Sequence, residues 1–289
     1  MQKVLYLLTL LLITVYTYAD VSPVVINRLT NNEGLSNSSV NVIYQDSNNL
    51  MWFGTWDGLN LYNSREFKTF KPNPNVPGNI TNNIIRDIIE TTKGKLWITT
   101  DNGINLYTPE AMRFQSFFYD NKENTIFKER SFLICKNSHN KVIASVYNTG
   151  LYYFDEELSD FILIRNLKET SLKKLFFDKD DNLWLFTDNN SLYRVNLDWS
   201  KNKPDIKDIK PVVLSQSSHD VFYNLYTNQI WEQNENRHIN IYDVPTETKI
   251  TEIPFSKVIS SIIFEKTGYI IGTANGLFSI QAPNHEKTG

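Results

Sequence analysis

Short apolar runs alternate with polar turns along most of the chain, and the alternation repeats. Segments 39–62 and 84–107 each contain an apolar run, a polar turn, a second apolar run with a tryptophan, a turn that contains glycine, and a third run ending in Asn-Leu-Tyr. Trp52 and Trp97 occupy the same place in the two copies, 45 residues apart. Runs of about four to eight residues, rich in Val, Ile, Phe and Tyr and bounded by Asn, Asp and Gly, predict short β-strands.

Four weaker copies follow, at 132–154, 173–195, 221–242 and 260–280. A repeat of about 40–47 residues with four short strands is typical of a β-propeller blade. A helical repeat of similar length is excluded because the apolar runs are too short and too rich in β-branched and aromatic residues. The predicted fold is therefore all-β, a β-propeller of four-stranded blades with six repeat units. One residue marks the second turn of each unit: Gly58, Gly103, Gly150, Ser191, His238 and Gly276.

The first unit predicts strands at 40–45, 50–55, 59–62 and 67–70. Segment 24–29 precedes a Gly-Leu-Ser-Asn sequence in the way that 67–70 precedes the corresponding part of the second unit, so it resembles an outer fourth strand. The sixth unit ends soon after its third strand. We therefore expect the N-terminal strand to complete the last blade and close the ring, which would leave no open sheet edge.

The first nineteen residues predict a secretory signal peptide. Lys3 precedes a nearly continuous apolar run over 4–15, and Thr17 and Ala19 place small residues before a cleavage site. A retained membrane anchor is the alternative, but the run is shorter than the ~20 residues that a spanning helix needs. We expect a signal peptide at 1–19, a propeller domain at 20–283 located in the periplasm, and a C-terminal tail at 284–289, with no later membrane span.

Composition narrows the function classes. The 289 residues carry a net charge of −3, which gives no basic face for nucleic acid. A single cysteine, Cys135, excludes a disulfide scaffold and a cysteine-based zinc site, and its apolar context predicts a buried core residue. The four histidines lack metal-ligand spacing, and no catalytic motif is present. No metal and no cofactor are predicted; the turn at 178–182 resembles a calcium loop but lacks its glycine and distal glutamate, so we expect a hairpin.

One face of a propeller is built by the turns between second and third strands and by the loops that lead into first strands, and ligands commonly bind there. Tryptophans 52, 97 and 184 recur in phase, which favours packing between blades over a sugar platform, whereas Trp56 lies in a turn. Amides, carboxylates and aromatic rings suit a sugar, although Asn and Asp also simply form turns. The candidate ligand-binding residues are Trp56, Asp57, Asp101, Asn102, Tyr147, Asn148, Asp188, Asn189, Asn234, Arg237, Asn275, Asn37, Asn82 and Asn83.

The segment NVIYQDSNNLMWFGTWDGLNLYNSREFKTFKPNPNVPGNITNNIIRDI, residues 41–88, resembles the two-component regulator propeller repeat, in particular the sensor region of hybrid two-component systems of glycan-degrading bacteria. The resemblance is strong in the first two units, good in the sixth and weak in the third to fifth. It implies a periplasmic sensor that binds a carbohydrate breakdown product, with an oligosaccharide or a second sensor domain as partner and homodimerisation within the full sensor.

Full members of this family add a second propeller, a β-sandwich domain, a transmembrane helix and a histidine kinase, which have no counterpart in this sequence. We therefore expect no enzymatic activity from this chain. The family's propellers usually have seven blades, so the chain either closes with six or is one blade short. Two other functions stay open: a structural or protein-interaction propeller and, less favoured, a polysaccharide-active enzyme with a pair of carboxylates.

Overall fold

The computed structural model describes residues 28–73, 75–92, 94–118, 132–167, 170–201, 203–215, 218–266 and 268–281. These residues form β-strands and one short 3₁₀ helix, η1 (Asn31–Glu33), which confirms the all-β prediction. No helix among them is long and apolar enough to cross a membrane. The predicted signal peptide, most of segment 24–29 and the tail at 284–289 lie outside the described residues.

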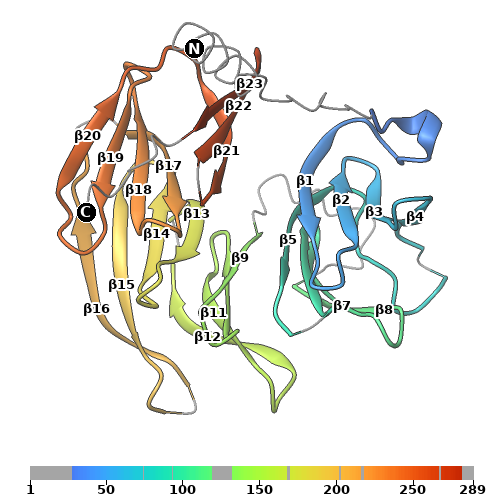
Figure 1. The fold of residues 1–289 in the computed structure, drawn as a ribbon. Helices are drawn as coiled ribbons and strands as arrows, with labels where there is room; N and C mark the ends of the chain where they lie inside the picture. The colour runs from blue at the N-terminus through green and yellow to red at the C-terminus, as the bar shows by residue number, and fades with distance from the viewer. Residues whose placement is uncertain are drawn as a thin grey trace, which may run out of the picture.

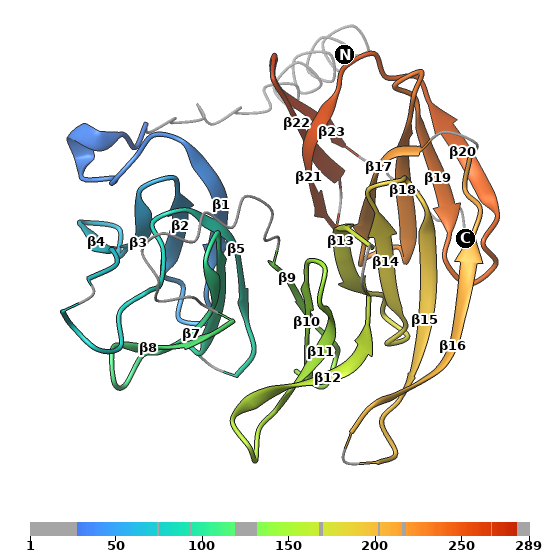
Figure 2. The same ribbon diagram turned by 180° about the vertical axis from the view of Figure 1, so that it is seen from behind.

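The strands form six sheets that follow one another along the chain, and each sheet is one blade (Figures 1 and 2). The first three blades are β1 (Val40–Gln45), β2 (Met51–Thr55), β3 (Gly58–Tyr62) and β4 (Phe67–Phe70); β5 (Ile85–Glu90), β6 (Leu96–Thr100), β7 (Gly103–Thr108) and β8 (Arg113–Phe117); and β9 (Phe132–Lys136), β10 (Val142–Val146), β11 (Gly150–Asp155) and β12 (Asp160–Asn166). The last three are β13 (Leu172–Phe177), β14 (Leu183–Thr187), β15 (Leu192–Asp198) and β16 (Asp205–Val212); β17 (Ser218–Asn224), β18 (Gln229–Asn234), β19 (Ile239–Asp243) and β20 (Lys249–Ile253); and β21 (Ile259–Glu265), β22 (Gly268–Thr273) and β23 (Gly276–Gln281).

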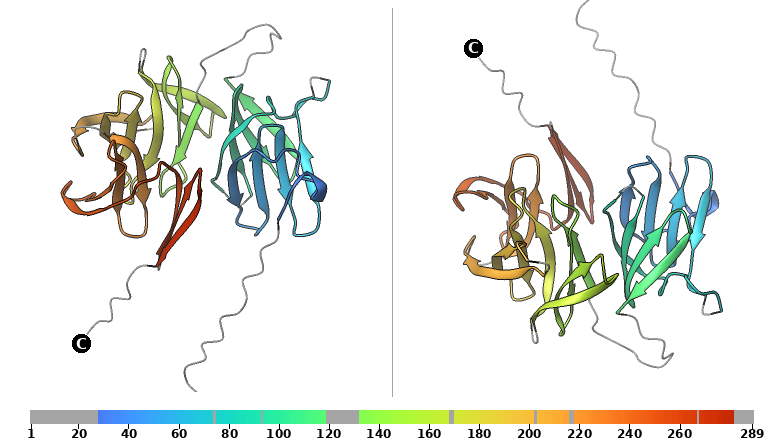
Figure 3. Two further views of the ribbon diagram at one scale, coloured as in Figure 1. Left: turned by 90° about the horizontal axis from the view of Figure 1, so that it is seen from above. Right: turned by 90° about the horizontal axis from the view of Figure 1, so that it is seen from below.

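The blades are antiparallel meanders arranged in a ring, as Figure 3 shows from above and below. This confirms a β-propeller, with six blades in the described part of the chain. Five sheets have four strands, but the sixth has three in the described residues, so the expected fourth strand of the last blade is not seen there. The expected N-terminal strand at 24–29 lies mostly outside the described residues. The described chain starts at residue 28, and residues 28–30 are not in a strand.

A β-bulge interrupts the first strand of five of the six blades, close to its beginning. The bulge adds one residue and so resets which side chains face which neighbour. In these five blades, the residue that follows the bulge pairs with one particular position of the second strand. In the third blade, which has no bulge there, Leu133 pairs with the equivalent position. These six equivalent residues are Val42, Asp87, Leu133, Lys174, Asp220 and Ser261.

Hydrophobic clusters join each blade to the next, from the first blade to the sixth. Trp52, Trp97 and Trp184 lie inside these clusters and are at most 2% exposed, so the predicted packing role is confirmed. Cys135 is buried between the third and fourth blades, also as expected. Burial of both faces of the blades explains why their inner strands are so continuously apolar.

The sixth and first blades meet differently. In the part of the chain that the structure describes, no hydrophobic cluster joins them, and Ile43 on β1 is 57% exposed while Ile263 on β21 is 59% exposed. Val42 and Tyr44 pack toward the second blade, so alternation places Ile43 on the opposite face of β1. Leu277 on β23 is also exposed. The ends of the ring therefore present apolar side chains to solvent.

An aspartate at the end of the first strand orders the following hairpin in the first and fourth blades. Asp46 accepts bonds from the amides of Asn48 and Leu50, and its other oxygen accepts a 2.8 Å bond from Trp52 Nε1. Asp178 makes the same set of bonds, with Trp184 Nε1 also at 2.8 Å. The turn at 178–182 is thus a hairpin, as predicted, and its first carboxylate is occupied by the protein itself.

Candidate functional site

A buried amide positions the loops that lead into the first two blades. Asn60 on β3 accepts a bond from the Ser36 amide and donates to Ser36 Oγ, which lies 3.0 Å from Thr55 Oγ1. These bonds tie the loop to the turn between β2 and β3, so both reach the same face of the disc. The second blade repeats the arrangement with Thr81, Thr100 and Asn105.

The candidate asparagines in these loops shape the backbone. Asn37 accepts a bond from the Ser39 amide and Asn82 from the Ile84 amide, which are the contacts of Asx turns. The backbone amides of Asn102 and Asn275 donate to threonine hydroxyls, and the backbone carbonyl of Asn83 accepts a bond from the Gly58 amide. For these five residues the structure shows turn-forming contacts.

Trp56 stands out on the same face. Its side chain is 50% exposed, and its Nε1 donates a 3.0 Å bond to Asn41 Oδ1. The guanidinium carbon of Arg86 lies 5.3 Å from the centre of the indole ring. Arg86 is held by two bonds to the Asp101 carboxylate, of 2.5 and 3.0 Å. These four residues, Asn41, Trp56, Arg86 and Asp101, form a row across the first and second blades, which we call the Trp56 row.

The remaining candidates lie in separate places. Asp57 pairs with Lys71 at 2.6 Å. Asp188 and Asn189 line a cavity of about 360 Å³ between the third and fourth blades, together with Arg165 and Ser171.

Further round the ring, Tyr147 is partly buried, and Asn148 adopts a positive φ of 54°. Asn234 accepts a bond from the His238 amide, and Arg237 donates to the Ser256 carbonyl. Among the described residues, the structure brings Trp56 and Asp101 into one cluster and Asp188 and Asn189 into one cavity. The other candidates lie apart from these two groups, and ligand binding by the face that they share stays a prediction.

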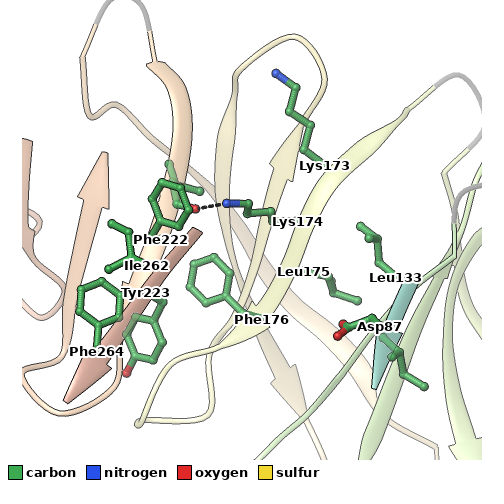
Figure 4. Close-up of a pocket in the computed structure, with 12 residues that line it drawn as sticks. Asp87, Leu133, Lys173, Lys174, Leu175, Phe176, Phe222, Tyr223, Ile262 and Phe264 are labelled. Carbon is green, nitrogen blue, oxygen red and sulfur yellow. Dashed lines mark hydrogen bonds between the residues drawn. The ribbon is translucent and has the colours of Figure 1, made fainter. Parts of the chain in front are cut away.

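A second group lies at the centre of the ring. A cavity of about 390 Å³ is bounded by first strands of the second to sixth blades, and Figure 4 shows its lining. Lys174 reaches across from the fourth blade to the fifth, where its ammonium donates a 2.7 Å bond to the Val221 carbonyl, pairs with Asp220 at 2.8 Å and lies 3.7 Å from the centre of the Phe222 ring. Burial lowers the pKa of Lys174 below its ordinary value, and the Asp220 carboxylate opposes this shift in part. The ammonium is thus anchored by three partners.

Asp87 lies on another wall of this cavity (Figure 4). Burial raises the pKa of its carboxyl from an ordinary 3.8 to about 6, and a 2.8 Å bond from the Ile88 amide opposes that rise. Within the described residues it forms no ion pair. Asp87 and Lys174 occupy equivalent positions just after the bulge of their strands.

Sequence reasoning selected turn and loop residues, and so it missed Arg86, Asp87 and Lys174. All three lie in first strands, where a charged side chain interrupts an apolar run: IIRDII in the second unit and KKLFF in the fourth. A charge inside a strand that is buried on both faces needs a partner or a cavity. That signal was available in the sequence.

The opposite face of the disc carries another hollow, of about 520 Å³, between the third and fourth blades. The His139 ring lies 3.1 Å from Asp181 at its rim. Trp199 also lines it, and its buried Nε1 has no hydrogen-bond partner among the residues that the structure describes.

Residues 34–57 and 79–102 both match the two-component regulator propeller repeat, the first of them spanning Trp56 and the second Asp101. Two segments of the chain are thus similar to this repeat. The resemblance inferred from segment 41–88 is thereby confirmed. No curated protein matches the chain in sequence.

Solved structures with a similar fold include extracellular domains of two-component systems. The extracellular domain of the hybrid two-component system BT3049 from B. thetaiotaomicron is 22% identical with a TM-score of 0.69, and the match covers 90% of this chain and 36% of that one. The corresponding domain of BT4673 is 19% identical with a TM-score of 0.66, over 88% and 36%.

PorZ, a surface component of the type-IX secretion system of Porphyromonas gingivalis, is 15% identical with a TM-score of 0.55, over 83% and 38%. At these identities the likeness shows the fold. The chain spans little more than a third of each of these structures.

Proposed function

We propose that this propeller is a ligand-binding domain of a two-component signalling system and that it recognises an oligosaccharide outside the cytoplasm. The observation that carries the proposal is the Trp56 row. It presents a half-exposed indole beside a guanidinium, a carboxylate and an amide, on the face where the turns and leading loops of the blades gather.

This combination suits a sugar. The apolar face of a pyranose packs against an aromatic ring, while its hydroxyls need donors and acceptors held in fixed positions. Arg86 is fixed by its two bonds to Asp101, and Asn41 is fixed by a 2.8 Å bond from its Nδ2 to the Ile85 carbonyl. A rigid polar frame lowers the entropy cost of binding a flexible ligand.

Placement in the periplasm rests on the predicted signal peptide at 1–19 and on the likeness to extracellular domains of two-component systems. The proposal assigns the chain a binding role and no catalytic step. Passage of the signal across a membrane would belong to other domains of the sensor.

Calorimetry with a panel of oligosaccharides tests the proposal. We expect at least one glycan to bind the unchanged chain, and Trp56→Ala to weaken that binding tenfold or more. Tyr226→Ala is the matched control, because Tyr226 is an aromatic residue of similar exposure, 48%, in a β17–β18 turn at the other end of the blades. Binding that survives Trp56→Ala would remove the Trp56 row from the proposal, and a panel without heat would remove ligand recognition by this chain.

A protein-interaction propeller is the second candidate. The apolar side chains that the first and sixth blades expose, Ile43, Ile263 and Leu277 among them, favour it. It would be the better explanation if no glycan binds.

A further inference from the structure

The carboxylate of Asp87 lies in the central cavity, and no described residue gives it a counter-charge. Its side chain accepts a bond from its own neighbour, the amide of Ile88, and the described residues offer it no ion pair. A partly desolvated carboxylate with a single neutral donor among the described residues is an unfavourable arrangement that a cation would relieve.

The groups that face Asp87 do not supply that cation. Burial raises the pKa of Tyr44 in the first blade and of Cys135 in the third, and the charge of Asp87 adds to the rise in each case. Both groups therefore stay neutral. From the fourth blade, Lys174 is engaged by Asp220. Lys173 donates a 2.7 Å bond to Asn190, and Figure 4 shows its side chain directed away from Asp87.

The rest of the cavity is mostly apolar. Phe176 of the fourth blade, Phe222 of the fifth, and Ile262 and Phe264 of the sixth lie across it from Asp87 (Figure 4). A volume of about 390 Å³ lies within the range of small-molecule sites. The cavity therefore offers one negative end and one hydrophobic end.

We propose that the central cavity binds a small organic cation, a primary ammonium with an apolar body, whose charged end bonds to Asp87 while its body packs against Phe176, Ile262 and Phe264. A charge-assisted bond to a desolvated carboxylate is stronger than a bond from a neutral hydroxyl. An anionic ligand is disfavoured because Asp220 already neutralises Lys174. This site shares no residue with the Trp56 row, so it goes beyond the proposed function and stands independently of it.

Binding of this kind depends on pH. The ammonium stays charged below pH 9, so the titration is that of Asp87, whose pKa is about 6. Only the ionised carboxylate binds the ammonium. Affinity therefore rises about tenfold between pH 5.0 and pH 7.5 and levels off above that.

Calorimetry of the full chain with n-hexylamine and 1-hexanol tests the proposal, because these probes have the same body and differ in the charged group. We expect hexylamine to bind at least tenfold more tightly than hexanol at pH 7.5 and to lose most of that advantage at pH 5.0. Asp87→Asn should remove the advantage at both pH values. Asp188→Asn, which alters an exposed carboxylate in a different cavity, should leave it unchanged.

Equal binding of amine and alcohol by the unchanged chain would overturn the proposal and would indicate adsorption to the exposed apolar faces. An amine preference that persists in Asp87→Asn would also overturn it. The comparison of the two probes at two pH values needs no variant, so it decides the matter even if Asp87→Asn folds poorly. Glycan binding that depends on Trp56 is measured separately, and either site can fail without the other.

Discussion

Two boundaries of the ring are made of the same kinds of strand: the one between the second and third blades and the one between the sixth and first. Their apolar side chains are buried at the first boundary and exposed at the second. At the first, Trp97 is 2% exposed and packs against the rings of Phe117, Phe154 and Phe161 at centroid distances of 4.7 to 5.7 Å. At the second, Ile43 and Ile263 are each more than half exposed.

This difference shows that the formation of a strand and the burial of its apolar face have separate requirements. An apolar residue at a given place in the unit predicts a strand and a face. Burial of that face requires a neighbouring blade, and burial is what stabilises, by about 1.5–3 kcal/mol for a large aliphatic or aromatic side chain. Equivalent residues should therefore have unequal energetic weight, and four measurements test this.

The largest effect is expected from Trp97→Ala. Its ring fills the second–third boundary, so its removal leaves a cavity and should lower the free energy of unfolding by about 3–5 kcal/mol. Ile263→Ala at the other boundary should change it by less than about 0.5 kcal/mol. Urea denaturation followed by circular dichroism measures both. Similar losses for the two variants would show that the sixth–first boundary is packed in solution.

Trp52→Phe tests the hydrogen-bonded part of a packed boundary. The variant keeps an aromatic ring but loses the 2.8 Å bond from Nε1 to the Asp46 carboxylate, at a cost of about 2–3 kcal/mol. Trp231→Phe is the matched control, because Trp231 Nε1 donates a longer bond, of 3.4 Å, to the neutral side chain of Gln229. We expect its loss to be less than half as large in the same denaturation assay. Equal losses would mean that the bond to Asp46 adds nothing beyond ring packing.

Asp87→Asn tests the inner rim of the second–third boundary through pH. The pKa of Asp87 in the folded chain, about 6, exceeds its ordinary value of 3.8, so the folded state holds its proton more tightly than the unfolded state. Its contribution to stability is therefore present below pH 4 and is lost as pH rises to about 6.

The asparagine variant lacks this titration. It should be more stable than the unchanged chain by about 1–2 kcal/mol at pH 7.5, allowing for the partial exposure of the residue, and equal to it at pH 4. Thermal unfolding at several pH values gives the comparison. A difference that does not vary with pH would contradict the assigned pKa.

The smallest effect on stability is expected at the exposed faces. Ile43→Ser combined with Leu277→Ser should alter the free energy of unfolding by less than about 1 kcal/mol, because both side chains are largely in solvent. Exposed apolar faces promote association, so the variant should self-associate less in sedimentation experiments. Unchanged association together with a large loss of stability would show that these residues are covered.

Much of the fold followed from the sequence. The strands predicted at 40–45 and 67–70 have those bounds in the structure, because turn residues limit them sharply on both sides. The fifth unit is one of the three weak copies of the repeat. Its buried Glu232, which accepts bonds from Ser218, Asn240 and Tyr242, stands where other blades place an apolar side chain. A polar network of that kind has no periodic pattern by which it could be predicted.

The site was less predictable. Trp56 and Asp101 were identified because they lie in turns, but Arg86, which connects them, extends from a strand to reach the same face. Asp87 and Lys174 both line the central cavity, and each lies just after a bulge in its strand. The position of a bulge depends on pairing with the next strand, and one isolated repeat does not reveal it.

The bulge also makes the centre of the ring chemically adjustable. The residue at the equivalent position of the six first strands, which follows the bulge in five of them, is a valine, an aspartate, a leucine, a lysine or a serine. These positions therefore carry different charge and polarity on one and the same repeated backbone. A propeller of this kind can acquire a new ligand preference through single substitutions in the first strands that line its central cavity.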